Sequence, residues 1–145
     1  MDKFTTQLKI AFASQYAFAI KAQNFHWNIE GIDFYQKHKM FQKIYEETYG
    51  AVDDFAENIR KIKAYTPASL YRFSALSAVD DEVEILDPQA MVAELLRDAE
   101  KMQEIMKVLF TEAEALGHHG LSNFLADRQD AFAKHAWFLR STLKA

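Results

Sequence analysis

The chain has 145 residues, a formal charge of −4 and an apolar fraction of 50%. Such an apolar content excludes a disordered chain, and the acidic balance lacks the basic footprint of a nucleic-acid-binding protein. The absence of cysteine excludes a disulfide framework and a thiolate metal site, so any metal would be held by histidine, carboxylate, carbonyl or water, which suits iron, zinc or manganese. With only 4 glycines and 2 prolines, the sequence favours a few long helices over a β fold.

The first predicted helix begins after Asp2, a typical N-cap residue, and runs to about residue 28. Its apolar stretch at residues 11–20 could be mistaken for the core of a signal peptide, but Ser14 and Gln15 interrupt it and the helical pattern continues beyond it. We interpret this stretch as part of a core helix. Because no run approaches the ~18 apolar residues of a membrane span, we expect a cytoplasmic protein. A short turn follows at residues 28–33.

The second predicted helix covers about residues 34–63. Its apolar positions recur in alternating steps of four and three residues, which is typical of a helix face that packs against neighbouring helices. This face includes Phe34, His38, Phe41, Tyr45, Thr48, Val52, Phe55, Ile59 and Ile62. Residues 64–86 lose the pattern and contain Pro67, so they predict a long crossover with a short helix near residues 69–75.

Asp87 and Pro88 predict the start of a third helix, as its N-cap and its first helical residue. Apolar residues continue with the same spacing to Leu116, and Gly117 is expected to end the helix. A fourth helix is predicted after Gly120. Two helical hairpins joined by one long crossover form a ferritin-like four-helix bundle, and we expect residues 1–145 to be a single all-α domain of this kind.

The sequence lacks the pattern that binds two irons inside such a bundle, because no glutamate stands three residues before a histidine. His26 and His38 instead flank the first turn, where antiparallel pairing would place their imidazoles side by side as half of a metal site. Asp53 and Glu57 are one helical turn apart and share a face. Asp53 lies 15 residues beyond His38, about 22 Å along the helix, so only a second copy related by a two-fold axis could complete the site.

Each of these residues also has an ordinary interpretation. A histidine on an apolar helix face, such as His38, is more often a core residue than a metal ligand, and Asp53 and Glu57 suit a solvated face. Trp27 is interpreted as a packing residue, and His118 and His119 as residues of an exposed turn. His135 is interpreted as a residue on a helix face. Spacing alone leaves these alternatives open.

A longer pattern surrounds the candidate ligands: Asn24-Phe25-His26-Trp27-Asn28-Ile29-Glu30-Gly31, then His38, then Asp53 and Glu57, and near the end Lys134-His135-Ala136-Trp137. This pattern extends over almost the whole chain and resembles the Dps family, the mini-ferritins named as DNA-binding proteins from starved cells. The resemblance implies a hollow dodecamer with centres at two-fold interfaces, where ferrous iron is oxidised, preferably by hydrogen peroxide, and then stored as ferric mineral. It also implies that the catalytic and metal-binding residues are His26 and His38 of one subunit with Asp53 and Glu57 of the facing subunit, and that Trp27 lies beside the centre.

The chain departs from the family pattern at several positions. The family usually has an aspartate four residues after the second histidine, where this chain has Gln42. Because an amide oxygen is a neutral ligand, we expect Gln42 to weaken Fe²⁺ binding, and a second iron is not expected to bind stably. Asn58 replaces a usual arginine, and Asn123 and Ala133 occupy the positions of the acidic residues that line the family's iron-access pore. Residues 1–25 contain only Lys3, Lys9 and Lys21 as cations, so we expect no lysine-rich N-terminal arm of the kind with which some members bind DNA.

Three functions remain open from the sequence. We favour a ferroxidase and iron store that consumes peroxide, with iron as its metal and zinc or manganese as substitutes. The second is a nucleoid protein that coats DNA, against which twelve copies at −4 each would carry about −48 and repel phosphate. The third is a structural or metal-buffering shell whose catalysis has weakened through Gln42.

Overall fold

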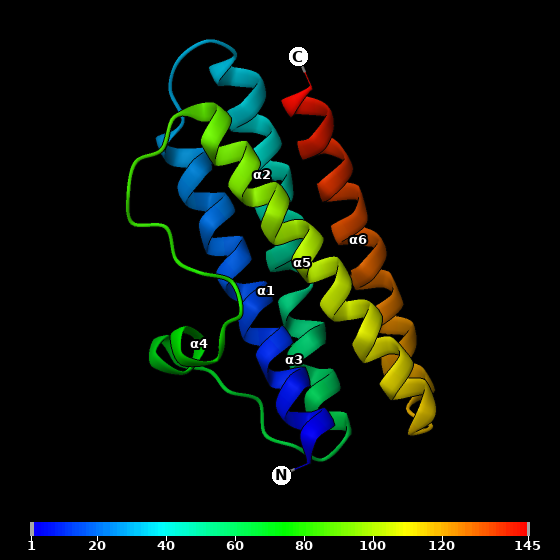
Figure 1. Cartoon of the computed structure of the whole chain (residues 1–145). Coiled ribbons are helices and arrows are strands. Elements are labelled where there is room, and N and C mark those ends of the chain that lie inside the picture. The colour runs from blue at the N-terminus through cyan, green and yellow to red at the C-terminus, as the bar shows by residue number, and fades with distance from the viewer. Residues whose placement is uncertain (1, 145) are drawn as a thin grey trace.

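Residues 2–144, which the computed structural model describes, contain helices and no strand. The helices are α1 (Lys3–Asn28), α2 (Phe34–Gly50), α3 (Val52–Lys61), α4 (Leu70–Leu76), α5 (Pro88–Ala115) and α6 (His119–Leu143). Figure 1 shows two antiparallel hairpins, in which α1 lies against the consecutive α2 and α3, and α5 lies against α6. The segment between α3 and α5 crosses from one end of the bundle to the other and includes the short α4. The predicted arrangement of two hairpins and one crossover is thereby confirmed.

The helix ends follow from the residues that stand there. Asp2 accepts a hydrogen bond from the backbone N–H of Thr5 at 2.7 Å, and Asp87 accepts one from Ala90 at 2.8 Å. Both carboxylates thus satisfy N–H groups that the first turn of a helix leaves free. After α5, Gly117 adopts a φ of 79°, a left-handed conformation that favours glycine and ends the helix. The following helix, α6, begins slightly earlier than predicted.

The second long helix is not continuous, since α2 ends at Gly50 and α3 begins after Ala51. The side-chain amide of Gln15 on α1 donates to the backbone carbonyl of Thr48 at 3.1 Å, and the same carbonyl accepts from the Ala51 N–H at 3.3 Å. A side chain that enters the helical hydrogen-bond ladder in this way bends a helix, and Gly50 adds weak helix propensity. The prediction of one uninterrupted helix over residues 34–63 is therefore corrected to two helices with a break at Ala51.

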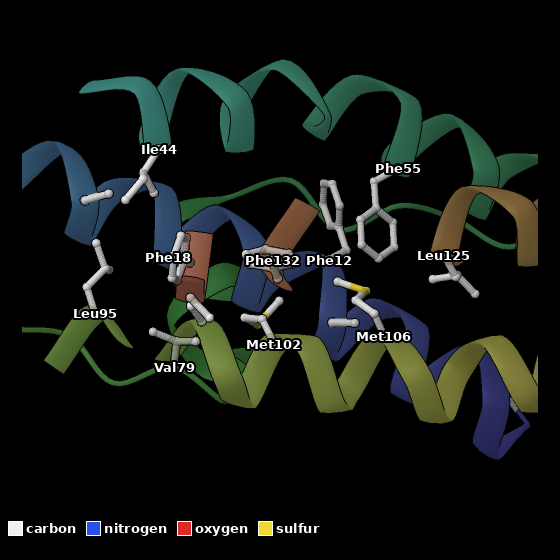
Figure 2. Packing of buried hydrophobic residues seen from close by; sticks show 14 of the residues in the cluster. Phe12, Phe18, Ile44, Phe55, Val79, Leu95, Met102, Met106, Leu125 and Phe132 are labelled. Carbon is white, nitrogen blue, oxygen red and sulfur yellow. The ribbon is translucent and has the colours of Figure 1, made fainter. Parts of the chain in front are cut away.

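Large apolar side chains from every long helix fill the interior of the bundle (Figure 2). Phe18 and Phe132 meet edge-on with ring centroids 5.1 Å apart, and Phe12 and Phe55 do so at 5.6 Å. Replacement of one such buried phenylalanine by alanine would cost about 3–5 kcal/mol of stability. Within residues 2–144, no helix is both long enough and apolar enough to span a membrane.

The predicted inward face of residues 34–63 is buried over only part of its length. Phe41, Phe55 and Ile59 are buried, whereas Phe34 is 42% exposed and His38 is half-buried. The first two turns of α2 therefore extend beyond the core. As a result, the histidine on this face lies where a ligand or a second copy can reach it, and it is not enclosed in the core of one chain.

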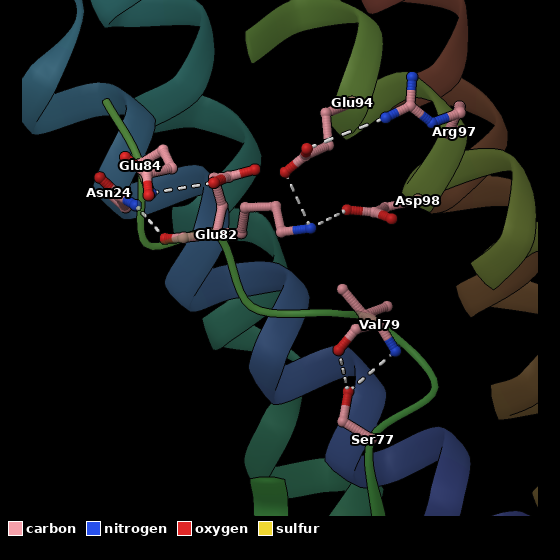
Figure 3. Close-up of polar contacts among 9 residues, drawn as sticks. Asn24, Ser77, Val79, Glu82, Glu84, Glu94, Arg97 and Asp98 are labelled. Carbon is pink, nitrogen blue, oxygen red and sulfur yellow. Dashed lines mark hydrogen bonds and ion pairs between the residues drawn. The ribbon is translucent and has the colours of Figure 1, made fainter. Parts of the chain in front are cut away.

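A buried lysine ties α1 to α5 near the crossover, where Figure 3 shows Glu94 and Asp98 on α5 and Glu82 in the crossover. Lys21 Nζ on α1 lies 2.7 Å from Asp98 Oδ2 and 3.2 Å from Glu94 Oε2, both on α5. The side-chain amide of Asn24 donates to the backbone carbonyl of Glu82, in the crossover, at 3.3 Å. The ion pairs join α1 to α5, and the Asn24 hydrogen bond holds the crossover against α1, which α4 also contacts.

Candidate metal centre

The two histidines of the first hairpin lie against each other, as the sequence predicts. His26 is in the last turn of α1, and its ring stacks on that of His38 with centroids 3.8 Å apart and planes 17° apart. Phe34 also stacks on His38 at 5.0 Å, and Tyr45 meets the edge of His26 at 5.2 Å. Neighbouring rings therefore fix the orientation of both imidazoles.

A tight turn sets the register of this pair. Between α1 and α2, Gly31 and Asp33 adopt φ values of 106° and 63°, in the left-handed region that glycine and aspartate tolerate best. The backbone N–H of Phe34 donates to the carbonyl of Gly31 at 3.1 Å and closes the turn. This reversal brings position 26 opposite position 38.

Each imidazole is held by the backbone of the other histidine. His26 Nδ1 lies 2.8 Å from the carbonyl oxygen of His38, and His38 Nδ1 lies 2.7 Å from the carbonyl oxygen of His26. Because a carbonyl oxygen only accepts, each Nδ1 has the hydrogen and donates it. The Nε2 atom of each neutral ring then keeps a free lone pair, which is the state in which histidine binds a metal. The sequence spacing predicted that the residues meet, but no sequence signal predicted these reciprocal hydrogen bonds.

The second half of the candidate centre is a carboxylate cluster at the start of α3. Carboxylate oxygens of Asp53, Asp54 and Glu57 all lie within 4.8 Å of one another, and the three side chains are exposed. Asp54 was not predicted as a candidate, although its i, i+3 spacing to Glu57 places both on the same face. Aspartates in a first helical turn also interact favourably with the helix dipole, so Asp53 and Asp54 stabilise α3 even without a cation.

The two halves lie far apart in one chain. Asp53 is 15 residues beyond His38, about 22 Å along the helix axis, and the break at Ala51 separates them. Figure 1 shows α2 and α3 following each other end to end along α1. One chain thus presents two half-sites, an imidazole pair and a carboxylate cluster, and does not bring them together into one complete site.

Gln42 and Trp27 lie close to the histidines in the sequence but have different surroundings. Gln42 is one helical turn after His38, and its amide nitrogen donates to Glu46 Oε1 at 2.7 Å. With the nitrogen engaged there, the amide oxygen is the atom left for a cation. Trp27 is 66% exposed, so the interpretation of Trp27 as a packing residue is wrong within one chain.

The other histidines have partners of their own. His135 is buried, with Nε2 2.7 Å from Glu47 Oε1, and the buried Arg128 forms a bidentate ion pair with the same carboxylate. Partial burial acts to raise the pKa of Glu47, but hydrogen bonds from His135 and Arg128 outweigh it and lower the pKa to about 2. His135 was predicted only to lie on a helix face, and this network was not predicted because its members are far apart in the chain. The exposed His119 pairs with Glu114 at 2.6 Å.

Comparison with known proteins agrees with this fold. Residues 5–145 match the family model of the ferritins, a ferritin-like domain. Antigen TpF1 of Treponema pallidum is 29% identical over 130 residues, which cover 87% of this chain and 72% of TpF1, and its crystal structure matches with a TM-score of 0.93 over 98% of this chain and 92% of that one. The DNA protection during starvation protein of Helicobacter pylori is 29% identical over 125 residues, covering 86% of this chain and 87% of that protein. Dps from Thermosynechococcus elongatus shares the fold with a TM-score of 0.95 at 21% identity, over 99% of this chain and 91% of that one. The chain therefore belongs to the ferritin-like family and, within it, to the Dps proteins.

Proposed function

We propose that this protein oxidises Fe²⁺ with hydrogen peroxide at centres that two copies build together, and that it keeps the ferric product inside a hollow shell of identical copies. Membership of the ferritin-like family implies iron as the metal. The dodecamer that the family resemblance implies is the shell we expect. Zinc and manganese prefer similar nitrogen and oxygen ligands, so both would compete for the centres.

The main support is the reciprocal pair of hydrogen bonds between His26 and His38. It leaves Nε2 of both stacked rings with a lone pair before any metal arrives, in a hairpin where His38 is half-buried and His26 is buried. A purely structural histidine pair would have no need to keep both Nε2 atoms available. Two neutral imidazoles with carboxylates from elsewhere form a nitrogen and oxygen ligand set that suits Fe²⁺.

A second copy would supply the missing carboxylates. In an isologous two-fold pair, Asp53 and Glu57 of each copy would face His26 and His38 of the other, which gives two identical centres per pair of copies. The histidines would hold Fe²⁺ through Nε2, and the carboxylates would balance its charge. Two Fe²⁺ ions give one electron each to one peroxide, which takes up two protons from solvent and leaves as two waters, while both irons become Fe³⁺.

Gln42 limits the charge that each centre offers. An aspartate at this position would add a negative charge one turn from His38, whereas the amide oxygen of Gln42 is neutral. In a partly desolvated centre, one charge changes the affinity for a divalent cation more than it would in bulk water. We therefore propose that each centre holds one iron under ordinary conditions.

Protection of DNA, the role that the name of the Helicobacter pylori relative expresses, would follow here from removal of iron and peroxide. A coat of protein on DNA would need positive charge, but the formal charge is −4 per chain and about −48 for twelve chains. We therefore propose chemical protection without direct contact between this protein and DNA.

Calorimetric titration with Fe²⁺ in the absence of oxygen, followed by addition of peroxide, tests the proposal. The wild-type protein should bind about one Fe²⁺ per chain at its tightest sites and oxidise it much faster than buffer does. His38→Ala should lose both properties, whereas His119→Ala, a matched change at an exposed histidine outside the centre, should keep them. Binding without faster oxidation would favour the metal-buffering shell, and equal behaviour of both variants would show that the histidine pair is not the site.

A further inference from the structure

Three tyrosines form a continuous row that starts at the histidine pair. Tyr45 meets the ring of His26 with centroids 5.2 Å apart, Tyr49 meets Tyr45 at 6.0 Å, and Tyr16 of α1 meets Tyr49 at 5.6 Å. All three tyrosines are half-buried. Each ring therefore contacts the next, and the row leads away from the imidazoles along α2.

The row ends at a groove that the carboxylate half-site of the same chain also lines. Tyr16, Tyr49 and Asp53 line one groove of about 650 Å³ between α1, α3 and the start of α4. Positions 38 and 53 are about 22 Å apart along the helix axis, and the row covers this distance as far as Tyr49, which lies about 6 Å before Asp53. Each chain thus has rings that can be oxidised between its own histidine half-site and a groove that its own Asp53 lines.

The phenol groups differ from ordinary aromatic packing in one respect. Phenylalanine rings would fill the same space, and Phe73 and Phe12 do continue the ring contacts beyond Tyr16. Only the phenol can give up an electron readily, and it does so together with its proton. Partial burial and the neighbouring phenols raise the pKa of Tyr49, which keeps it protonated at neutral pH.

A centre with one iron lacks one of the two electrons that peroxide needs. In the isologous pair proposed above, the histidines of one copy belong to one centre and its carboxylates belong to the other. The tyrosine row inside each copy therefore joins the two centres of the pair. On the basis of that proposed function, we propose that Tyr45, Tyr49 and Tyr16 transfer an electron between the two centres, so that two single irons reduce one peroxide.

The electrons and protons balance along this row. At the first centre, peroxide takes one electron from Fe²⁺, one electron with its proton from Tyr45, and one proton from solvent, and it leaves as two waters. Tyr45 regains an electron and a proton from Tyr49. Tyr49 then takes an electron from Fe²⁺ at the second centre and a proton from solvent. The products are two Fe³⁺ ions and two waters, with no free hydroxyl radical. Until Fe²⁺ at the second centre gives its electron, Tyr16 shares the unpaired electron with Tyr49.

Electron paramagnetic resonance of samples frozen soon after peroxide addition tests this row in the wild-type protein. With far fewer Fe²⁺ ions than chains, the second centre of a pair is empty, so a tyrosyl radical should remain for each iron oxidised. With one Fe²⁺ for each chain, the radical should disappear and two irons should be oxidised for each peroxide. Absence of a tyrosyl signal at scarce iron, or a tryptophanyl signal in its place, would overturn the proposal.

Tyrosine variants provide a second test of the row, with one Fe²⁺ for each chain. Tyr45→Phe and Tyr49→Phe keep the rings and should lose the radical, release hydroxyl radical to a spin trap, and lower the ratio of oxidised iron to peroxide from two towards one. Tyr71→Phe, an exposed tyrosine on α4, should behave as the wild-type protein does. If the wild-type protein does not bind or oxidise Fe²⁺, the proposed function fails together with the row. If it oxidises Fe²⁺ and the Tyr45 and Tyr49 variants match it, the row alone fails.

Discussion

Glu47 should stabilise the fold through charge, because it joins α2 to Arg128 and His135 of α6. Its pKa falls from 4.5 to about 2 in the folded chain, which corresponds to about 3 kcal/mol at about 1.36 kcal/mol per pKa unit. The Glu47 side chain is 39% exposed, and solvent screening reduces this contribution to about 1–2 kcal/mol. Glu47→Gln removes the charge, keeps the size, and leaves the buried Arg128 without a carboxylate. We therefore expect a loss of about 2 kcal/mol, or about 4–6 °C in the melting temperature.

The pH dependence of this loss has a definite sign. Because the folded-state pKa of Glu47 is lowered, its stabilising effect is complete above the unfolded value of 4.5 and is lost as pH falls towards about 2. The stability difference between the wild-type protein and Glu47→Gln should be full at pH 7. Proton linkage predicts that roughly less than half of this difference remains near pH 3. A difference that stays constant over this range would show that the carboxylate charge is not its cause.

Thermal unfolding followed by circular dichroism measures both the loss of stability in Glu47→Gln and its pH dependence. The protein concentration is kept fixed because assembly also raises the melting temperature. Glu104→Gln is the matched control, because it removes the same charge from an exposed glutamate on α5. We expect the control to change the melting temperature by about 1 °C or less. Equal melting temperatures for the two variants at pH 7 would refute the stabilising role of the Glu47 network.

Gln42→Asp should tighten Fe²⁺ binding on the order of tenfold, about 1.4 kcal/mol, and admit a second iron, because it adds one negative charge beside the cation. Calorimetric titration measures this affinity, with Gln36→Asp on the exposed side of α2 as the control. An unchanged affinity for Gln42→Asp would show that position 42 is not part of the centre. Light scattering should give a particle of about twelve times the 16.8 kDa chain, and a monomer or a plain dimer at micromolar concentration would contradict the shell. Gel-shift assays with plasmid at neutral pH and physiological salt should show no binding, and a shift that higher salt reverses would contradict the charge argument.

The fold was largely predictable because each long helix has its own apolar spacing and most helices have their own end signals. Asp87 and Gly117, for example, act on the nearest backbone groups and can be recognised without the rest of the structure. The break at Ala51 could not be predicted in this way. It depends on Gln15, which reaches the Thr48 carbonyl from another helix.

The candidate site was likewise predictable in part. The spacing across one short turn predicted that His26 and His38 meet, and the length of a helix predicted that Asp53 stays apart from them. The reciprocal hydrogen bonds of the imidazoles depend on the turn conformation, which no spacing rule contains. Tyr16 joins Tyr49 across two helices, so the row of tyrosines becomes visible only in three dimensions.

The sharing of each centre between two copies is tested most directly by mixing two defective variants. His38→Ala removes an imidazole and keeps the carboxylates, whereas a combined Asp53→Ala and Glu57→Ala variant keeps the histidines. Each variant alone should lose Fe²⁺ binding, because every centre in its own assembly lacks one half. In a mixed pair, one of the two centres takes its histidines from the second variant and its carboxylates from the first, and that centre is complete.

When an equal mixture is unfolded and refolded together, half of the pairs should be mixed, so about a quarter of all centres should bind Fe²⁺ again. Calorimetric titration without oxygen counts these sites, and the same two variants mixed after separate refolding provide the control. Native mass spectrometry confirms that mixed assemblies are present. Recovery of about a quarter of the wild-type sites is the result we expect. Mixed assemblies that bind no more Fe²⁺ than the separate variants do would contradict a centre shared between two copies.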